Sequence, residues 1–197
     1  MRRIGAVAGC MFIFCAFAPA QIPTGGNVFF GYSYSRGNAF TKDAPPPPSP
    51  LDPRLNLNGW EASIEGKYLP WIGVVADLDW HYGSHSASPA CIPPGCTGAA
   101  IHLNASRHQL MFGPRVSVSL AKYTPFAQLL IGVAHQSDSG PNISNSDTTF
   151  ATAIGGGLDY KLIKGVAARV QLDSVHTRFF DSGQNDLRFS MGIVFRF

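Results

Sequence analysis

The most constraining feature of this sequence is a strict alternation of large apolar residues with small or charged residues over residues 187–197. Successive side chains of a β-strand point to opposite faces, so a period of two predicts a strand with two different faces. The apolar face carries Leu187, Phe189, Met191, Ile193, Phe195 and Phe197. The other face carries Arg188, Ser190, Gly192 and Arg196, with Val194 as its only apolar member.

The same period recurs seven times upstream of this segment. The predicted strands cover about residues 27–36, 57–68, 72–80, 109–118, 127–134, 150–160 and 166–173. The 21 glycines and 15 prolines argue against a helical bundle. Beyond the N-terminal region, no apolar run is long enough for a transmembrane helix, which needs about 20 residues. If the chain crosses a membrane, it must do so with strands.

The connections between the predicted strands alternate in length. Tight turns fall near residues 67–70, 120–124 and 162–164. The long polar segments cover residues 37–53, which include the proline tract 45–48, and residues 82–104, 136–147 and 177–185. Short turns on one rim and long loops on the other are typical of an outer-membrane barrel with both chain ends in the periplasm.

Alternation alone does not distinguish a barrel in lipid from a soluble, lipocalin-like barrel, whose apolar face points inward. Two compositional features favour lipid on the outside: the polar face is rich in small residues, as a narrow interior requires, and aromatic residues stand at strand ends. These aromatic residues are Trp60, Tyr68, Trp71, Trp80, Tyr160 and Phe197. We therefore predict an all-β fold, a closed antiparallel eight-stranded up-and-down transmembrane β-barrel with short periplasmic turns and long extracellular loops.

Closure of the barrel follows because hydrocarbon offers no hydrogen-bond partner to a strand edge. Residues 27–36 should therefore pair with residues 187–197. Eight strands leave an interior just wide enough to be filled by side chains. The inward face is predicted to carry a lumen charge network of Glu61, Glu65, Lys67, Asp77, Asp79, Arg115, Asp159, Arg169, Asp173, Arg188 and Arg196. The near balance of acids and bases predicts mutual ion pairs and no open pore, with a small-solute channel as the alternative.

Residues 1–20 have the layout of a secretory signal peptide. Two arginines precede an apolar stretch over residues 4–17, and residues 18–20 form an A-x-A cleavage site. The predicted organisation is therefore a signal peptide over 1–20 and one barrel domain over 21–197. Cys10 lies in a sequence that resembles a lipoprotein box, but most of the apolar stretch follows it, which argues against lipidation.

The remaining charges and cysteines restrict the possible partners. Removal of the signal peptide leaves 13 basic against 12 acidic residues, so there is no basic excess that would favour nucleic acid. Cys91 and Cys96 would then be the two cysteines left, and in an oxidising compartment they predict a local disulfide. A two-thiol metal site is less favoured, since none of the histidines nearby, His81, His85 and His102, has finger-like spacing. No metal or cofactor is expected.

Short segments of the predicted strands carry a resemblance to a known family. They are Gly31-Tyr32-Ser33-Tyr34, Gly59-Trp60-Glu61-Ala62-Ser63, Pro125-Phe126-Ala127, Gly132-Val133-Ala134, Gly155-Gly156-Gly157-Leu158-Asp159-Tyr160 and residues 188–197. With these, the chain resembles the small outer-membrane β-barrel family related to the transmembrane domain of outer membrane protein A and to opacity-type surface proteins. The resemblance implies a place among the lipids of the bacterial outer membrane and recognition of the strand ending in Phe197 by the barrel-insertion machinery. There is no length for a peptidoglycan-binding domain like that of outer membrane protein A, so no cell-wall anchoring is expected.

Two classes of function fit a barrel of this kind. Some small barrels act on lipid A, and one deacylase type uses a His and a Ser two residues apart beside a carboxylate. His135 and Ser137 have this spacing and Asp147 begins the next predicted strand, although that family would have Glu there. Because this match to the deacylase type is incomplete, we predict a structural or surface-interaction protein and not an enzyme. Its long loops would bind an extracellular ligand. A lipid A deacylase-like hydrolase is the alternative.

Overall fold

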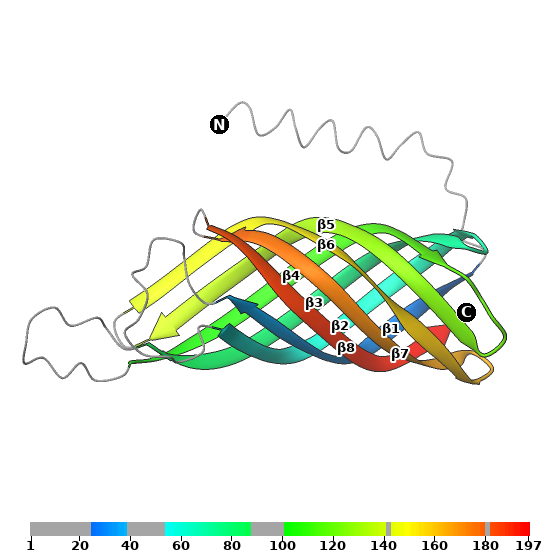
Figure 1. Ribbon diagram of the computed structural model, residues 1–197, viewed down its shortest axis with the longest axis horizontal. Coiled ribbons are helices and arrows are strands. Elements are labelled where there is room, and N and C mark those ends of the chain that lie inside the picture. The colour runs from blue at the N-terminus through cyan, green and yellow to red at the C-terminus, as the bar shows by residue number, and fades with distance from the viewer. Residues whose placement is uncertain (1–24, 39–53, 88–100, 141–142, 180–181) are drawn as a thin grey trace, which may run out of the picture.

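The structure, a computed structural model, describes residues 25–38, 54–87, 101–140, 143–179 and 182–197 (Figure 1). Nearly all of these residues form eight strands: β1 (Gly25–Asn38), β2 (Arg54–Leu69), β3 (Ile72–Ala87), β4 (Ile101–Ser117), β5 (Tyr123–Gly140), β6 (Ile143–Ile163), β7 (Val166–Phe179) and β8 (Ser182–Arg196). Within the described ranges there is no helix with the length and apolar character to span a membrane. The predicted signal peptide and the pair Cys91 and Cys96 lie outside the described residues.

The strands form one closed antiparallel barrel in which each strand pairs with its sequence neighbours. The predicted pairing of the first strand with the last is confirmed, from Asn27 opposite Arg196 to Arg36 opposite Leu187. At the end of this seam, Gly26 and Phe197 exchange backbone hydrogen bonds of 3.0 and 3.1 Å. Every strand edge is thereby paired, as lipid requires.

The two ends of the barrel differ. Tight turns join β2 to β3, β4 to β5 and β6 to β7, and they lie at the end that also holds the C-terminus (Figure 1). Gly165, in the last of these turns, has a φ of +83°, a conformation that costs glycine little. Ala121, in the middle turn, has a φ of +53° despite its Cβ atom. We call this the turn end, and the opposite end the loop end.

The strands are longer than the sequence predicts, mainly toward the loop end. β5 has 18 residues and β6 has 21, whereas about 9–11 residues cross a bilayer. Residues 136–147 and 177–185, predicted as long loops, are mostly strand: the ladder of β5 and β6 continues to Gly140 opposite Ile143. The difference has a physical reason, because strands that leave the lipid lose the apolar alternation by which a sequence reveals them.

The polarity of the barrel is inverted relative to a soluble protein. Large apolar side chains such as Phe30, Leu129 and Ile154 are 58%, 52% and 65% exposed on the outside. Glu61 and Arg188, in contrast, are buried inside. A soluble lipocalin-like barrel would show the opposite arrangement. The exposed belt and the polar interior make this a transmembrane barrel, as predicted.

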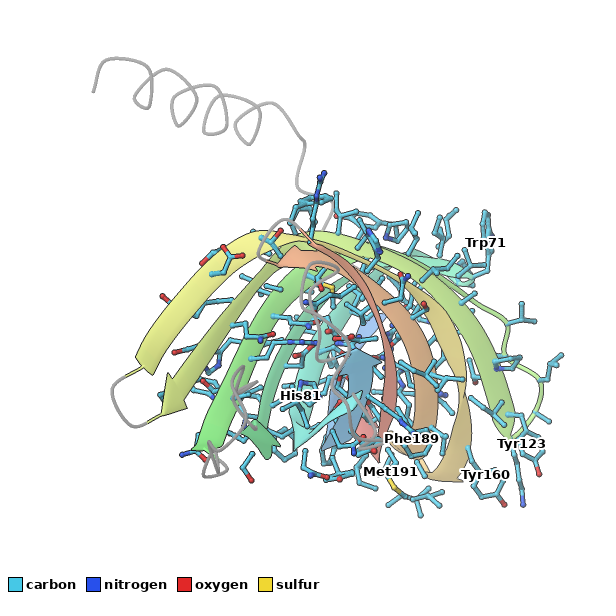
Figure 2. All side chains as sticks on the ribbon, turned by 60° about the vertical axis from the view of Figure 1, so that its left-hand side comes forward. Trp71, His81, Tyr123, Tyr160, Phe189 and Met191 are labelled. Carbon is cyan, nitrogen blue, oxygen red and sulfur yellow. The ribbon has the colours of Figure 1, made fainter. Side chains whose placement is uncertain are left out.

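Aromatic side chains border the apolar belt. At the turn end, Trp71, Tyr123 and Tyr160 project outward (Figure 2). The buried His81, in contrast, lies within the ring of strands. The rings of Tyr123 and Tyr160 lie 5.3 Å apart on neighbouring strands. Toward the loop end, Trp60 and Trp80 stack with centroids 6.1 Å apart. Two aromatic levels of this kind are the usual borders of a membrane-embedded barrel.

Candidate functional site

The centre of the lumen is built around one arginine. Nη1 of Arg188 donates to Asp77 at 2.8 Å and to Asp79 at 2.5 Å, and Nη2 donates to Asp173 at 2.9 Å. Glu61 lies 3.7 Å from its Nε. We call these five residues the central cluster. They come from β8, β3, β7 and β2 and are all 0–1% exposed, so their side chains fill the cross-section of the barrel at this level.

Neutral side chains add hydrogen bonds to the central cluster, although Oδ2 of Asp77 has no hydrogen-bond partner among the described residues. Gln171 donates from Nε2 to Glu61 at 2.9 Å and to Asp173 at 2.7 Å, and Gln128 donates to the other Asp173 oxygen at 2.8 Å. Ser190 donates to Glu61 at 2.5 Å. His81 places Nδ1 3.0 Å from Asp79 and Nε2 3.0 Å from Ser33. Buried charges need such partners, because an unmade hydrogen bond in a water-excluded site is costly.

The turn end of the lumen holds a second group of charges with the opposite balance. Arg169 donates hydrogen bonds to Asp159 from Nε at 2.6 Å and from Nη2 at 3.0 Å, and Arg196 donates to the same carboxylate at 2.9 Å. Nη1 of Arg115 donates to Glu65 at 3.2 Å. Lys67 lies 4.0 Å from Glu65 and donates to Ser117 at 2.9 Å. We call these four bases and two acids the mouth group; they surround a cavity of about 250 Å³.

The loop end of the lumen contains a third group of charges, which the sequence did not predict. Arg107 on β4 binds Asp186 on β8 through Nη1, and its Nε and Nη2 donate to Gln136 at 3.2 and 2.9 Å. Both charged residues lie beyond the predicted strand limits. The inward orientation of Arg107 could nevertheless be predicted, because it lies two residues from the buried Gln109 and therefore on the same face of the strand.

The eleven predicted lumen charges all lie on the inner face or at its mouth. Nine are buried, whereas the side chains of Lys67 and Arg196 are 23% and 30% exposed. The charges are more segregated than the sequence suggests. The central cluster sets four acids against Arg188, and the mouth group sets four bases against two acids. Strand parity gives the face of a residue but not which charges meet across the lumen.

The residues proposed for a deacylase-like site do not come together. His135 is exposed on the outside of β5, and its Nδ1 lies 2.7 Å from Oγ1 of Thr148 on β6. Asp147 precedes Thr148 and therefore points to the opposite face, where it stands opposite the buried Gln136. Ser137 keeps the parity of His135. The carboxylate thus cannot orient the imidazole, which a nucleophilic triad requires.

A row of rings crosses the outside of the barrel near the loop end. Trp80 packs edge-on against His108 with centroids 3.8 Å apart, and His108 stacks on His135 at 6.4 Å. The row continues the Trp60–Trp80 stack along the outer face of the barrel. Over the ranges that the structure describes, no three His, Cys, Asp or Glu side chains are grouped so that they could hold a metal ion.

Comparisons with known proteins agree with this architecture. No family model and no curated protein matches the chain. Among solved structures it is similar to Ail of Yersinia pestis in complex with the heparin analogue sucrose octasulfate, at 15% identity over 88% of this chain and 98% of that chain, with a TM-score of 0.57. It is also similar to Neisserial surface protein A, at 7% identity over 87% and 97% of the chains, with a TM-score of 0.63. The chain thus has the fold of the small outer-membrane β-barrel proteins.

Proposed function

We propose that this protein is a surface-interaction protein of the bacterial outer membrane, which presents its loop-end connections outside the cell. The observation that carries the proposal is the filled lumen: the central cluster ties β2, β3, β7 and β8 together across the barrel. A barrel fixed in this way is a rigid scaffold. Loops on a rigid scaffold are a common form of binding surface.

Strand length supports the same proposal. β5 and β6 continue well beyond the length needed to cross a bilayer, and their ladder carries Ser137 opposite Ser146 and Ser139 opposite Ser144. β5 and β6 therefore form a hairpin that extends beyond the apolar belt. The similar protein Ail was solved with a sulfated sugar, so sulfated glycans are sensible first probes for the present chain.

Further parts of the proposal concern biogenesis. Residues 1–20 are removed as a signal peptide, and the barrel-insertion machinery reads the last strand, which ends in Phe197. Cys91 and Cys96 form a disulfide in the connection between β3 and β4. A closed loop of this size would lower the entropy cost of presenting one conformation to a partner.

Loop replacement tests the proposed function. Residues 39–53 and residues 88–100 are replaced, separately, by a short Asn-Gly turn, and cells displaying each variant are tested on arrays of sulfated glycans and matrix proteins. We expect at least one replacement to abolish binding while heat-modifiable migration on gels shows an intact barrel. As a matched control, Lys122→Gln at the turn end should leave binding unchanged. Binding that survives both replacements would contradict the proposal.

The lipid A alternative has a separate test. Mass spectrometry of lipid A from cells with and without the protein should show the same acyl chains, because Asp147 and His135 lie on opposite faces. If the protein removes an acyl chain and His135→Ala abolishes this removal, the protein is an enzyme instead.

Single-channel recording tests the channel alternative. Because the central cluster fills the lumen, we expect no steady conductance for the intact barrel.

A further inference from the structure

The cavity at the turn end lies at the opposite end of the barrel from the proposed binding loops, and it has features of a ligand site. It is enclosed by the ends of seven strands, with a volume of about 250 Å³. Its lining includes the whole mouth group and Phe126, together with Gly26 and Phe197, which face each other at the turn end of the closing seam. A volume of this size holds a small molecule or ion but no folded partner.

The charge of the cavity favours an anion. Four cationic side chains line it against two carboxylates, and both carboxylates are already shared. Asp159 accepts from Arg169 and from Arg196, while Oε2 of Glu65 accepts from Arg115 and, at 2.7 Å, from Asn27. The other oxygen of Glu65 lies 4.0 Å from Nζ of Lys67 and makes no hydrogen bond to the described residues. Two positive charges in excess therefore remain on the cavity wall.

One cationic donor of the cavity has no partner among the described residues. Nη1 of Arg169 is buried and makes no hydrogen bond, although Nε and Nη2 of the same guanidinium are occupied by Asp159. Arg169 as a whole is 1% exposed, and it lines the cavity at the turn end. A buried, charged N–H without an acceptor is costly, which indicates that an acceptor is supplied from outside the chain.

The guanidinium groups are held in place by aromatic packing. The ring of Phe126 contacts two of them, with its centroid 4.4 Å from Cζ of Arg115 and 4.6 Å from Cζ of Arg169. The ring of Phe29 also packs near Arg169, with its centroid 5.2 Å from Cζ. Packing of this kind restrains the guanidinium groups before a ligand binds, which lowers the conformational entropy lost on binding.

We propose that this cavity binds a small oxyanion of the phosphate or carboxylate class, entering from the turn end of the barrel. Arg169 donates to it from Nη1, and Lys67 and Arg196 supply charge at the entrance. Guanidinium and ammonium groups are the usual protein partners of such oxygens. The oxyanion is either free in solution or the headgroup phosphate of a lipid in the adjacent leaflet.

Titration with inorganic phosphate tests this site. The full chain, ¹⁵N-labelled and refolded in a non-ionic detergent, is titrated with phosphate and, separately, with chloride at matched ionic strength. The readout is the Nε–Hε resonance of Arg169 in NMR spectra. We expect a saturable shift with phosphate that chloride does not reproduce. No saturable shift with phosphate would overturn the proposal.

Two variants show whether binding belongs to the cavity. The double variant Lys67→Gln, Arg196→Gln removes the two partly exposed cations and keeps the buried pairs, so the barrel should fold; it should weaken phosphate binding by about tenfold or more. Lys164→Gln removes an exposed charge from the same rim outside the cavity and should leave the affinity unchanged. Equal weakening by both variants would show unspecific attraction and overturn the proposal.

The source of the oxyanion is decided in nanodiscs of phosphatidylglycerol. If the Arg169 resonance already lies at its phosphate-bound position without added phosphate, the site is filled by a lipid headgroup. If it moves there only on titration, the ligand is a soluble anion. Either result supports an oxyanion site. A resonance that stays at the free position in both conditions overturns it.

Discussion

Replacement of Arg188 by methionine tests the role of the central cluster. The side chain makes four short contacts to carboxylates, at 2.5 and 2.8 Å from Nη1, 2.9 Å from Nη2 and 3.3 Å from Nε. Methionine fills part of the volume but leaves four buried carboxylates without their shared cation. Removing one partner of a buried ion pair costs about 3–5 kcal/mol, and here three aspartates lose a hydrogen bond at once. We therefore expect Arg188→Met to lower the free energy of unfolding by at least about 3 kcal/mol.

The measurement is urea unfolding of the refolded barrel in detergent micelles or vesicles, followed by tryptophan fluorescence. The three tryptophans are suitable probes, because Trp60, Trp71 and Trp80 all lie on the outer face and pass from lipid to water on unfolding. Arg178→Met provides the matched control: the residue is an exposed arginine at the loop end of β7, and its replacement should change the free energy of unfolding by no more than about 0.5 kcal/mol.

A compensating variant separates charge from volume. Adding Asp77→Asn and Asp79→Asn to Arg188→Met removes two of the uncompensated charges at nearly constant shape. We expect this triple variant to recover about 1–2 kcal/mol, since residues of one network couple by about 0.5–3 kcal/mol. If the free energy of unfolding of Arg188→Met lies within about 0.5 kcal/mol of that of the unmodified protein, the central cluster does not stabilise the barrel.

Three further predictions concern the outer face, the turns and the loop end of the lumen. Ile154 and Ile163 are both 65% exposed on β6, but Ile154 lies between Phe150 and Tyr160 within the apolar belt, whereas Ile163 lies at the rim. Ile154→Arg should therefore lower the free energy of unfolding in vesicles by about 2–4 kcal/mol, and Ile163→Arg by about 0–1 kcal/mol. Equal losses would place the lipid belt elsewhere. Gly165→Ala should destabilise the barrel by about 1 kcal/mol in urea titrations, because alanine is strained at the positive φ of this position. Ala121→Gly should be neutral or slightly stabilising, because it relieves the strain of alanine at a positive φ. A stabilising Gly165→Ala together with a destabilising Ala121→Gly would contradict these turn conformations. Asp186→Asn should loosen the loop end around Arg107, seen as faster amide exchange of β8 near Leu187 and unchanged exchange at Ile193; unchanged exchange at both positions would show that the pair is dispensable.

The fold was predictable because lipid imposes a simple rule on every strand. Apolar residues such as Ile154 and Phe195 must point outward wherever the strand lies in the bilayer, so the period of two is visible in the sequence. The same rule put Arg188 and Asp77 on the inner face. Closure between the first and last strands then follows from the need to pair every edge.

The ends of the strands were not predictable by the same rule. Residues such as Ser137 and Ser146 pair in the ladder of β5 and β6 beyond the belt, where neither face needs to be apolar. Their composition is that of a loop, and the long loop predicted over residues 136–147 followed from it. The missed contact of Arg107 with Asp186 has the same origin.

The contacts inside the lumen depend on stagger and on reach across the barrel, which strand parity does not contain. Arg188 meets Asp77 on a strand that is not its neighbour, and the separation of the acidic central cluster from the basic mouth group results from this arrangement. The register of β5 against β6 likewise decides that His135 meets Thr148 and not Asp147. Such information enters only with the three-dimensional structure.

The most direct test of the inverted barrel is a spin-label accessibility scan of β8 in lipid vesicles, with the native cysteines replaced by serine. Single cysteines at Met191 and Ile193 face outward in the structure, and those at Ser190 and Val194 face the lumen. We expect oxygen, which concentrates in lipid, to reach labels at 191 and 193 readily and a water-soluble nickel complex to reach them poorly, while labels at 190 and 194 are shielded from oxygen. Nickel access at 191 and 193 equal to that of a water-exposed site would contradict a transmembrane barrel.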